Sequence, residues 1–271
     1  MISAHGTSAV ISQMPAGSLP AGRVEMRRFG IFESDLAIDF TNGNQAGLIT
    51  HLLEQCAADS EIISPAVFFR ELSVGKRIEY LLTLAASDDR SPFKFSFKCS
   101  GCAQEVEMEL TLDEIAAIQS RADLIETVDV EVGKHSFLFR KPTGLDQENW
   151  ANGDFRNGEE AARSMLAILA DDPDQTEKLG DMDLDLIDEA MDDADPLVNF
   201  RCQIGCLECG AENEFLIDLC DVGLGMLSRL QQQLVVMVHK LASHYNWSEK
   251  EIFAVPHWRR TKYLDLIAAG R

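Results

Sequence analysis

The chain has 271 residues, with 24 Lys and Arg against 45 Asp and Glu, so its formal net charge is −21. This acidity argues against proteins that bind nucleic acid or anionic membranes by general electrostatic attraction, because those surfaces are themselves negative. No apolar run approaches the roughly 20 residues that span a bilayer. The first residues also lack a signal-peptide pattern, so we expect a cytoplasmic protein that does not bind membranes.

The N-terminal part combines an irregular start with helical patterns. Residues 1–22 are rich in Gly, Pro and small residues without a helix or strand period, which predicts a flexible N-terminal arm. Short strands are expected at residues 23–29 and 35–40. Hydrophobic spacing then predicts helices over residues 46–57 and 65–86, with Gly75 breaking the second into two segments.

Alternating apolar residues dominate the middle of the chain. Residues 93–98 and 105–110 alternate with period two around Cys99-Ser100-Gly101-Cys102, which predicts a hairpin whose turn carries two thiols. The elements expected next are a helix at 112–120, a hairpin of strands 128–132 and 135–140, and helices at 145–150 and 158–169.

Residues 171–195 form an acidic insertion in which twelve of 25 residues are Asp or Glu. We interpret it as a mobile, solvent-exposed segment with a short amphipathic helix. The apolar face of that helix would consist of Leu184, Ile187 and Met191. A calcium loop is the alternative, because carboxylates alternate from Asp181 to Asp185. No Gly follows them, however, and no Glu closes a twelve-residue loop.

A second cysteine pair repeats the first. Cys206-x-x-Cys209 lies 107 residues after Cys99-x-x-Cys102 and is also followed by an alternating stretch. Two thiolates three residues apart on a tight turn can bind one metal ion, and two such knuckles complete a tetrahedral shell. The sequence therefore predicts a structural Zn²⁺ site formed by Cys99, Cys102, Cys206 and Cys209, in the manner of a zinc ribbon.

Other roles for the seven cysteines remain open at this point. The two pairs could be buried thiols without metal, or a redox motif, although neither pair opens a helix as a thioredoxin-type motif would. Cys202 could replace one ligand, whereas Cys56 and Cys220 lie in apolar contexts that predict core positions. Four protein ligands would leave no position for water, so such a zinc would stabilise the fold and not activate a nucleophile.

The C-terminal part predicts helices over residues 224–245, from Ser248 to Val255, and from Pro256 onward. His239 and His244 lack a Cys or acidic residue at a fitting spacing for a second metal site. Phosphate loops, nucleophile elbows and paired catalytic carboxylates are missing as well, and we expect no enzymatic activity. Trp247, Trp258 and Tyr263 are either aromatic anchors for a partner or packing residues of these helices.

Several motifs follow one another in an order similar to that of a known family. Residues 72–77, Leu-Ser-Val-Gly-Lys-Arg, precede the first cysteine pair, and residues 140–148, Arg-Lys-Pro-Thr-Gly-Leu-Asp-Gln-Glu, follow it. The second pair is followed by residues 239–249, His-Lys-Leu-Ala-Ser-His-Tyr-Asn-Trp-Ser-Glu, and by residues 259–264, Arg-Arg-Thr-Lys-Tyr-Leu. Over roughly residues 60–270, the chain resembles the baseplate hub assembly chaperone family of T-even-type contractile phage tails. Relatives of that family occur in prophages and phage-tail-like contractile injection systems.

The resemblance implies a non-enzymatic assembly factor that contacts hub, spike or other tail proteins. It also implies that both cysteine pairs are zinc-ribbon-like knuckles. A zinc-containing component retained in the finished baseplate is the alternative, and a nucleic-acid-binding zinc ribbon is a weaker one. An enzyme with an open zinc site, in which a His replaces one Cys, is a further alternative.

The expected fold is α+β, with a β-hairpin zinc-ribbon-like core, an inserted mixed segment and a C-terminal helical module. The predicted divisions are residues 1–22, 23–222 and 223–271.

Overall fold

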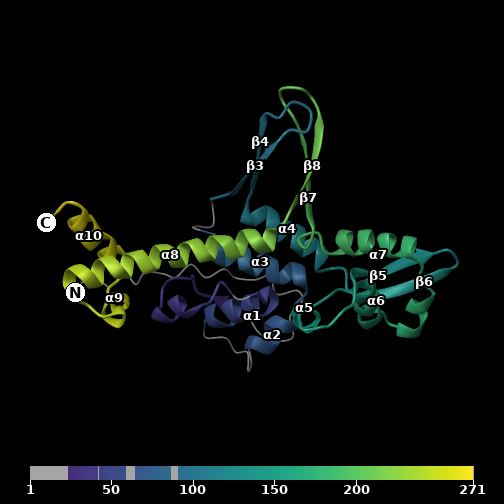
Figure 1. The fold of residues 1–271 in the computed structure, drawn as a ribbon, viewed down its shortest axis with the longest axis horizontal. Coiled ribbons are helices and arrows are strands. Elements are labelled where there is room, and N and C mark those ends of the chain that lie inside the picture. The colour runs from purple at the N-terminus through teal and green to yellow at the C-terminus, as the bar shows by residue number, and fades with distance from the viewer. Residues whose placement is uncertain (1–23, 42, 59–64, 87–90, 271) are drawn as a thin grey trace.

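A computed structural model describes residues 24–41, 43–58, 65–86 and 91–270 (Figure 1). The described chain is elongated. A helical body carries two upright hairpins, a small sheet with its helices lies at one end, and a helical arm extends at the other. The predicted mixed α+β class, with small antiparallel hairpins and a C-terminal helical region, is confirmed. The predicted arm of residues 1–22 lies outside the described residues.

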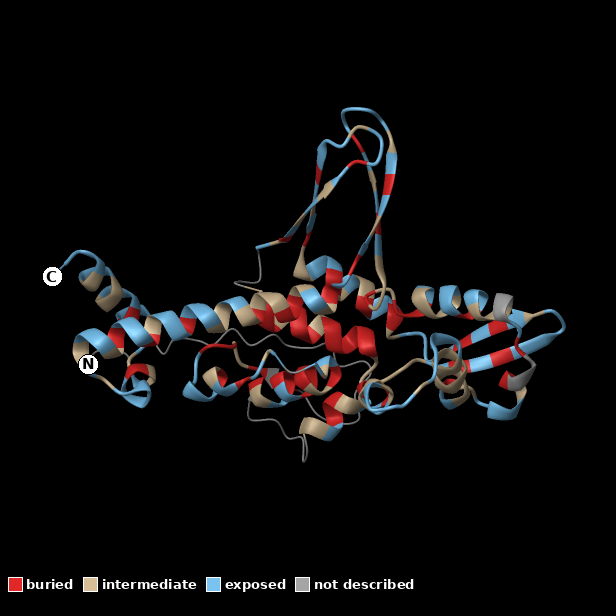
Figure 2. Ribbon diagram, viewed as in Figure 1, coloured by how far each residue is buried: buried red, intermediate tan, exposed pale blue. Residues whose placement is uncertain are grey.

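The helical body holds the largest hydrophobic cluster of the described residues. It consists of α1 (Gln45–Cys56), α2 (Pro65–Glu71), α3 (Val74–Ala85) and the first half of α8 (Leu219–Tyr245), where Figure 2 shows many of the buried residues. The predicted helix over residues 46–57 is confirmed. The one predicted over residues 65–86 is two helices, as expected, but their break falls at Ser73 and not at Gly75. The Ser73 hydroxyl accepts a hydrogen bond from the Lys76 amide and so caps α3.

Gly75 lies in the first turn of α3. This position needs a glycine because a buried carboxylate occupies the space that a side chain would fill. Oδ2 of Asp195 accepts a hydrogen bond from the Gly75 amide at 2.9 Å, and a Cβ on Gly75 would lie 2.0 Å from Oδ1 of Asp195. Asp195 is only 2% exposed, and burial raises the pKa of its carboxyl group. This contact joins the start of α3 to a residue 120 positions later in the chain.

The N-terminal strands are shorter than predicted. Within the described residues 24–29 only β1 (Glu25–Met26) forms, paired with β2 (Ala57–Ala58), and the prediction of a strand at 35–40 is wrong. Residues Glu33–Ala37 form the 3₁₀-helix η1 instead. The fully buried Asp35 accepts hydrogen bonds from the Gly30 amide at 2.7 Å and from Arg27 at 2.6 Å, which holds the backbone in a turn.

A junction between α3 and α5 (Gly144–Ala151) brings together two motifs that are far apart in the sequence. The Gly144 amide donates to the carbonyl of Leu72 at 3.1 Å, and Ser73 and Thr143 form an isolated β-bridge. Arg77 is 1% exposed, and a Cβ on Gly144 would lie 1.7 Å from its Nη1 atom. Residue 144 must therefore be glycine if the buried guanidinium is to keep its place.

Besides the short β1–β2 pair, three antiparallel hairpins supply the β structure of the described residues. Their strands are β3 (Phe93–Lys98) with β4 (Glu105–Leu110), β5 (Thr127–Val132) with β6 (His135–Arg140), and β7 (Phe200–Gly205) with β8 (Glu212–Ile217). Strands β3, β4 and β8 lie in the stretches whose alternation predicted them, and β5–β6 is the other predicted hairpin. We call β3–β4 and β7–β8 the first and second knuckle hairpins. They stand side by side on the body, and their tips meet (Figure 1).

The helix–hairpin–helix order occurs twice with one spacing. The first unit is α3, the first knuckle hairpin and α4 (Leu112–Ala122); the second is α7 (Asp181–Ala194), the second knuckle hairpin and α8. Helix α7 begins 107 residues after α3, and α8 begins 107 residues after α4. The repeat predicted from the cysteines thus extends to the helices on both sides.

The acidic insertion contains the amphipathic helix expected there, α7, and Ile187 and Met191 of its predicted apolar face pack into a small core. The 3₁₀-helix η2 (Pro173–Lys178) and α7 form a small core with α6 (Gly158–Leu169) and the β5–β6 hairpin. Ile187 of α7 is fully buried and Ala194 is 4% exposed, so apolar contacts hold α7 against the sheet. The carboxylates therefore follow a helix and do not form a calcium-binding loop.

Helix α8 crosses the predicted boundary at residues 222 and 223 without a break. Its first half packs on α3, and its second half leaves the body as an arm that carries α9 (Glu249–Ala254) and α10 (His257–Ala268). Trp247 lies 4.8 Å from the Tyr245 ring and 5.3 Å from the Tyr263 ring, so it packs inside the arm. None of the described helices combines the length and hydrophobicity of a bilayer-spanning segment.

Candidate metal centre

Aromatic stacking holds the two knuckle hairpins face to face. Phe97 of β3 and Phe215 of β8 stack with ring centroids 4.1 Å apart and planes 11° from parallel. Phe95 continues the stack on the same face of β3. Because alternate residues of a strand point to one side, the predicted apolar face of each hairpin lies toward the other hairpin.

Both cysteine pairs adopt the same turn. In the first, the Cys99 amide donates to the Gln104 carbonyl at 2.8 Å, and the Ala103 amide donates to the Cys99 carbonyl at 2.9 Å. In the second, the corresponding bonds run from Cys206 to Ala211 at 2.9 Å and from Gly210 to Cys206 at 2.8 Å. Ala103 and Gly210 both have positive φ, at 59° and 73°. The two turns thus present their thiols alike.

The four predicted ligands converge at the tips of the hairpins. The Sγ atoms of Cys99 and Cys209 are 3.6 Å apart, those of Cys102 and Cys206 are 3.7 Å apart, and all four lie within 4.8 Å of one another. A tetrahedral ion with metal–sulfur bonds of about 2.3 Å separates its sulfurs by about 3.8 Å. The sulfur positions therefore fit one tetrahedral metal ion. All four cysteines are free of disulfide bonds.

The turn of the first knuckle favours the ionised form of one cysteine, Cys99. The backbone amides of Cys102 and Gly101 lower the pKa of Cys99 to about 6, and the Gly101 amide lies 3.3 Å from its sulfur. The Gln104 amide lowers the pKa of Cys102, but desolvation and the three neighbouring sulfurs outweigh it and raise that pKa to about 12. Without a cation the four sulfurs cannot all ionise, because their negative charges repel one another.

Asn213 is a residue of this centre that our sequence analysis missed. Its side chain is buried between the knuckles, where Oδ1 accepts hydrogen bonds from the amide and hydroxyl of Ser100 at 2.8 and 2.9 Å. Its Nδ2 donates to the Ala211 carbonyl at 3.0 Å and lies 3.6 Å from Sγ of Cys99. One amide thus connects both turns and a ligand. The only signal in the sequence is a polar residue at an inward position of an alternating strand.

The remaining cysteines lie apart from this cluster. Cys202 packs in the core beneath the hairpins, and its thiol lies 3.6 Å from the Phe215 carbonyl, so the alternative in which it replaces a ligand is wrong. Burial raises the pKa of both Cys56 and Cys220 to about 12, as expected for core thiols. His239 and His244 are exposed on α8 and belong to no metal-binding group of the described residues.

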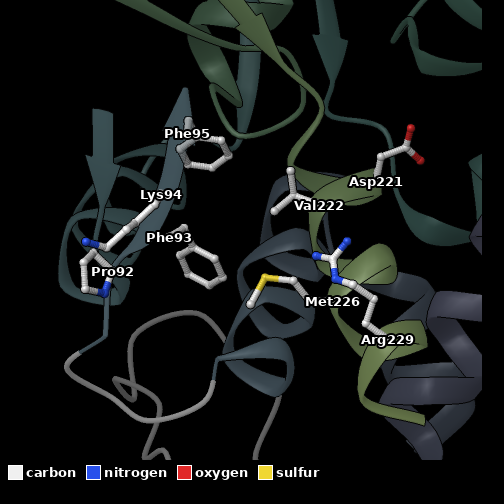
Figure 3. A pocket seen from close by; sticks show the side chains of 8 residues that line it. All are labelled: Pro92, Phe93, Lys94, Phe95, Asp221, Val222, Met226 and Arg229. Atoms are coloured by element: carbon white, nitrogen blue, oxygen red, sulfur yellow. The ribbon is translucent and has the colours of Figure 1, made fainter. Parts of the chain in front are cut away.

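A shallow groove of about 590 Å³ lies at the foot of the first knuckle hairpin, against α8 (Figure 3). Phe93 and Phe95 of β3 face Val222 and Met226 across it. Its one lining carboxylate, Asp221, accepts a hydrogen bond from Gln45 at 2.6 Å. Lys94 and Arg229 complete the polar part of the described lining.

Comparison with protein-family models, with curated protein sequences and with solved structures finds no match to this chain.

Proposed function

We propose that Cys99, Cys102, Cys206 and Cys209 bind one structural Zn²⁺ and that the protein is a non-enzymatic assembly factor for the baseplate hub of a contractile tail or tail-like particle. The zinc assignment is supported by four sulfurs at tetrahedral spacing, two of them in buried residues. Four thiolate ligands leave no position for a water nucleophile, and the ion would stabilise the contact between the hairpins.

The observation that carries the assembly role is the α3–α5 junction. The two motifs of the resemblance, residues 72–77 and 140–148, are about 70 positions apart in the sequence but form one hydrogen-bonded contact. Beside this contact, Arg140 pairs with Asp146 inside the second motif at 2.6 Å, and Arg77 of the first motif donates to the Ala46 carbonyl of α1 at 2.7 Å. The motifs therefore form one structural element, as expected if the resemblance extends to the fold of the tail-assembly chaperones.

Nucleic-acid binding is the weaker alternative. Two of the three cations near the knuckles are already paired, Lys94 with Glu109 at 2.8 Å and Arg201 with Asp192 at 3.0 Å. Phosphate binding would have to break these pairs on a chain of net charge −21. A mobility-shift assay at low salt should therefore show no binding to DNA or RNA.

Affinity purification of the full chain from cells that produce a contractile tail tests the proposal. Hub or spike proteins should co-purify, whereas an equally tagged unrelated acidic protein should recover neither. Elemental analysis should give about one zinc per chain. Recovery of no tail protein would overturn the assembly role. Presence of the chain in finished particles would favour a retained baseplate component.

A further inference from the structure

The C-terminal arm differs in charge from the rest of the molecule. We define the arm as residues 230–271, the outer half of α8 with α9 and α10. It carries six Lys and Arg against three Asp and Glu, whereas residues 1–229 carry 18 against 42. Figure 1 places α10 at one end of the elongated molecule and the acidic helix α7 toward the other. The chain is therefore polarised along its length.

The cations of the arm are also not neutralised. In the described part of residues 24–229, eight Lys and Arg side chains form ion pairs with carboxylates. The structure describes five Lys and Arg side chains in the arm, and none of them forms an ion pair with a carboxylate. They are Lys240, Lys250, Arg259, Arg260 and Lys262. Arg260 is 3% exposed and lies over the Phe253 ring at 5.0 Å, and burial lowers the pKa of its guanidinium group.

Helix α10 presents these charges beside apolar side chains. Trp258, Lys262 and Leu266 are spaced four residues apart, so they form one stripe along the helix. Trp258 is 62% exposed and Leu266 is 42% exposed, while Tyr263 of the same helix packs against Trp247. An exposed Trp flanked by Arg259 and Lys262 has the composition of an interface anchor.

Helix α7 presents the complementary composition. Leu186 is 50% exposed, and the exposed acidic side chains of Asp185, Glu189 and Asp193 surround it along the outer face. Asp192 of this helix pairs with Arg201 at 3.0 Å, whereas Asp185, Glu189 and Asp193 take part in no ion pair with the described residues. The outer face therefore keeps exposed carboxylates that a cation of a second copy could pair with.

We propose that the α10 stripe docks on the outer face of α7 of a second copy of this chain. Because the two surfaces lie on opposite parts of an elongated molecule, they would meet between copies and not within one. Each copy would then use one surface and leave the other free, a head-to-tail arrangement that forms open chains or closes into rings. At physiological salt the Debye length is about 8 Å. Salt therefore screens the long-range repulsion between two acidic chains more strongly than the attraction between opposite charges in direct contact. This inference is independent of the zinc and of the tail-assembly role.

Sedimentation equilibrium of the full chain tests the docking. In about 0.15 M salt the average mass should rise above that of one chain between about 1 and 100 µM, and about 1 M salt should reverse the rise. The variant Arg259→Glu with Lys262→Glu should weaken association by about tenfold or more, and so should Glu189→Lys with Asp193→Lys. An equimolar mixture of the two variants should associate again, because each supplies the charge that the other lacks.

Two further variants complete the experiment. Trp258→Ala, which keeps all charges, should weaken association through loss of the apolar contact. Lys240→Glu with Lys250→Glu places the same charge change elsewhere on the arm and should leave association unchanged. A chain that stays monomeric at every concentration would overturn the proposal. It would also be overturned by equal association of the charge variants, or by no recovery on mixing.

Discussion

The two knuckle hairpins have the same register and the same turn, yet they differ at the position directly beneath the sulfurs. Val106 pairs with Phe97 in the first hairpin, and Asn213 pairs with Ile204 at the equivalent position of the second. Val106 packs against Cys99 and Cys206, whereas Asn213 makes hydrogen bonds to both turns. The comparison indicates that the shared geometry needs only the thiols and the turn, and that the hydrogen bonding between the hairpins comes from one side.

Loss of a ligand should have the largest effect on this paired arrangement. Cys206→Ser, or removal of the metal by a chelator, should lower the free energy of unfolding by several kcal/mol. Structural zinc contributes about 10–16 kcal/mol of binding in zinc-finger peptides. Calorimetry together with zinc analysis measures the effect. Cys202→Ser, outside the cluster, is the matched control and should keep the metal. Equal metal content in both variants would contradict a four-cysteine site.

Replacing Asn213 by the residue of the first hairpin should have the next largest effect. Asn213→Val removes the side-chain acceptor of the partly buried Ser100 amide, which should cost about 1 kcal/mol. Metal affinity should fall about 10–100-fold, as when second-shell partners of metal ligands are removed. Competition with a chromophoric chelator measures this change. Val106→Ala is the control on the other hairpin, and its metal affinity should stay near that of the wild type.

Exchanging the residues after the second cysteine of each knuckle should change stability in opposite directions. Gly210→Ala places a Cβ in the left-handed region and should destabilise by about 1 kcal/mol, although a Cβ there would meet no atom within 4 Å. Ala103→Gly relieves the same strain and should stabilise by up to about 1 kcal/mol. Thermal unfolding of both variants provides the test. Changes of the same sign would show that the two turns are not equivalent.

The contact between the two helix–hairpin–helix units should show a small dependence on pH. Burial raises the pKa of Asp195, so the folded state binds its proton more tightly than the unfolded state does. The protonated Asp195 therefore contributes its full stabilisation at pH values below the ordinary Asp pKa of about 3.9. This contribution to the free energy of unfolding is lost as the pH rises through the higher pKa of the folded state. Asp195→Asn keeps an acceptor for the Gly75 amide and should raise stability at neutral pH by up to about 1 kcal/mol. Denaturant unfolding as a function of pH measures the difference, and a variant with an unchanged pH profile would refute this role.

The sequence predicted the parts of the fold that depend on local patterns. Period-two alternation identified the knuckle hairpins because each buries one face, and the spacing of thiols identified the four residues that converge. Capping by Ser73 was present in the sequence but was outweighed by Gly75 as a break signal. Long-range contacts were not predictable in the same way. Nothing near Asp195 indicates that it caps a helix 120 residues earlier, and nothing near Asn213 indicates Ser100 as its partner.

The acidic insertion was predictable only in part. Helical spacing identified Ile187 on the apolar face of a helix, but the sequence does not indicate that the β5–β6 hairpin is the surface that buries it. A few apolar residues at helical spacing were enough to order the segment once that surface was present. Helix α8 likewise packs on α3, a contact 100 or more residues away in the sequence that its own spacing does not indicate.

The separation of the two cysteine pairs has a consequence for synthesis. At about 5–20 residues per second, Cys206 is made roughly 5 to 20 s after Cys99, which lies 107 residues earlier. During that interval the first knuckle has only two thiols, and its partner hairpin with Asn213 does not yet exist. The tip of the molecule therefore becomes complete only late in translation, and a nascent chain interrupted before that point exposes an unfilled pair of thiols.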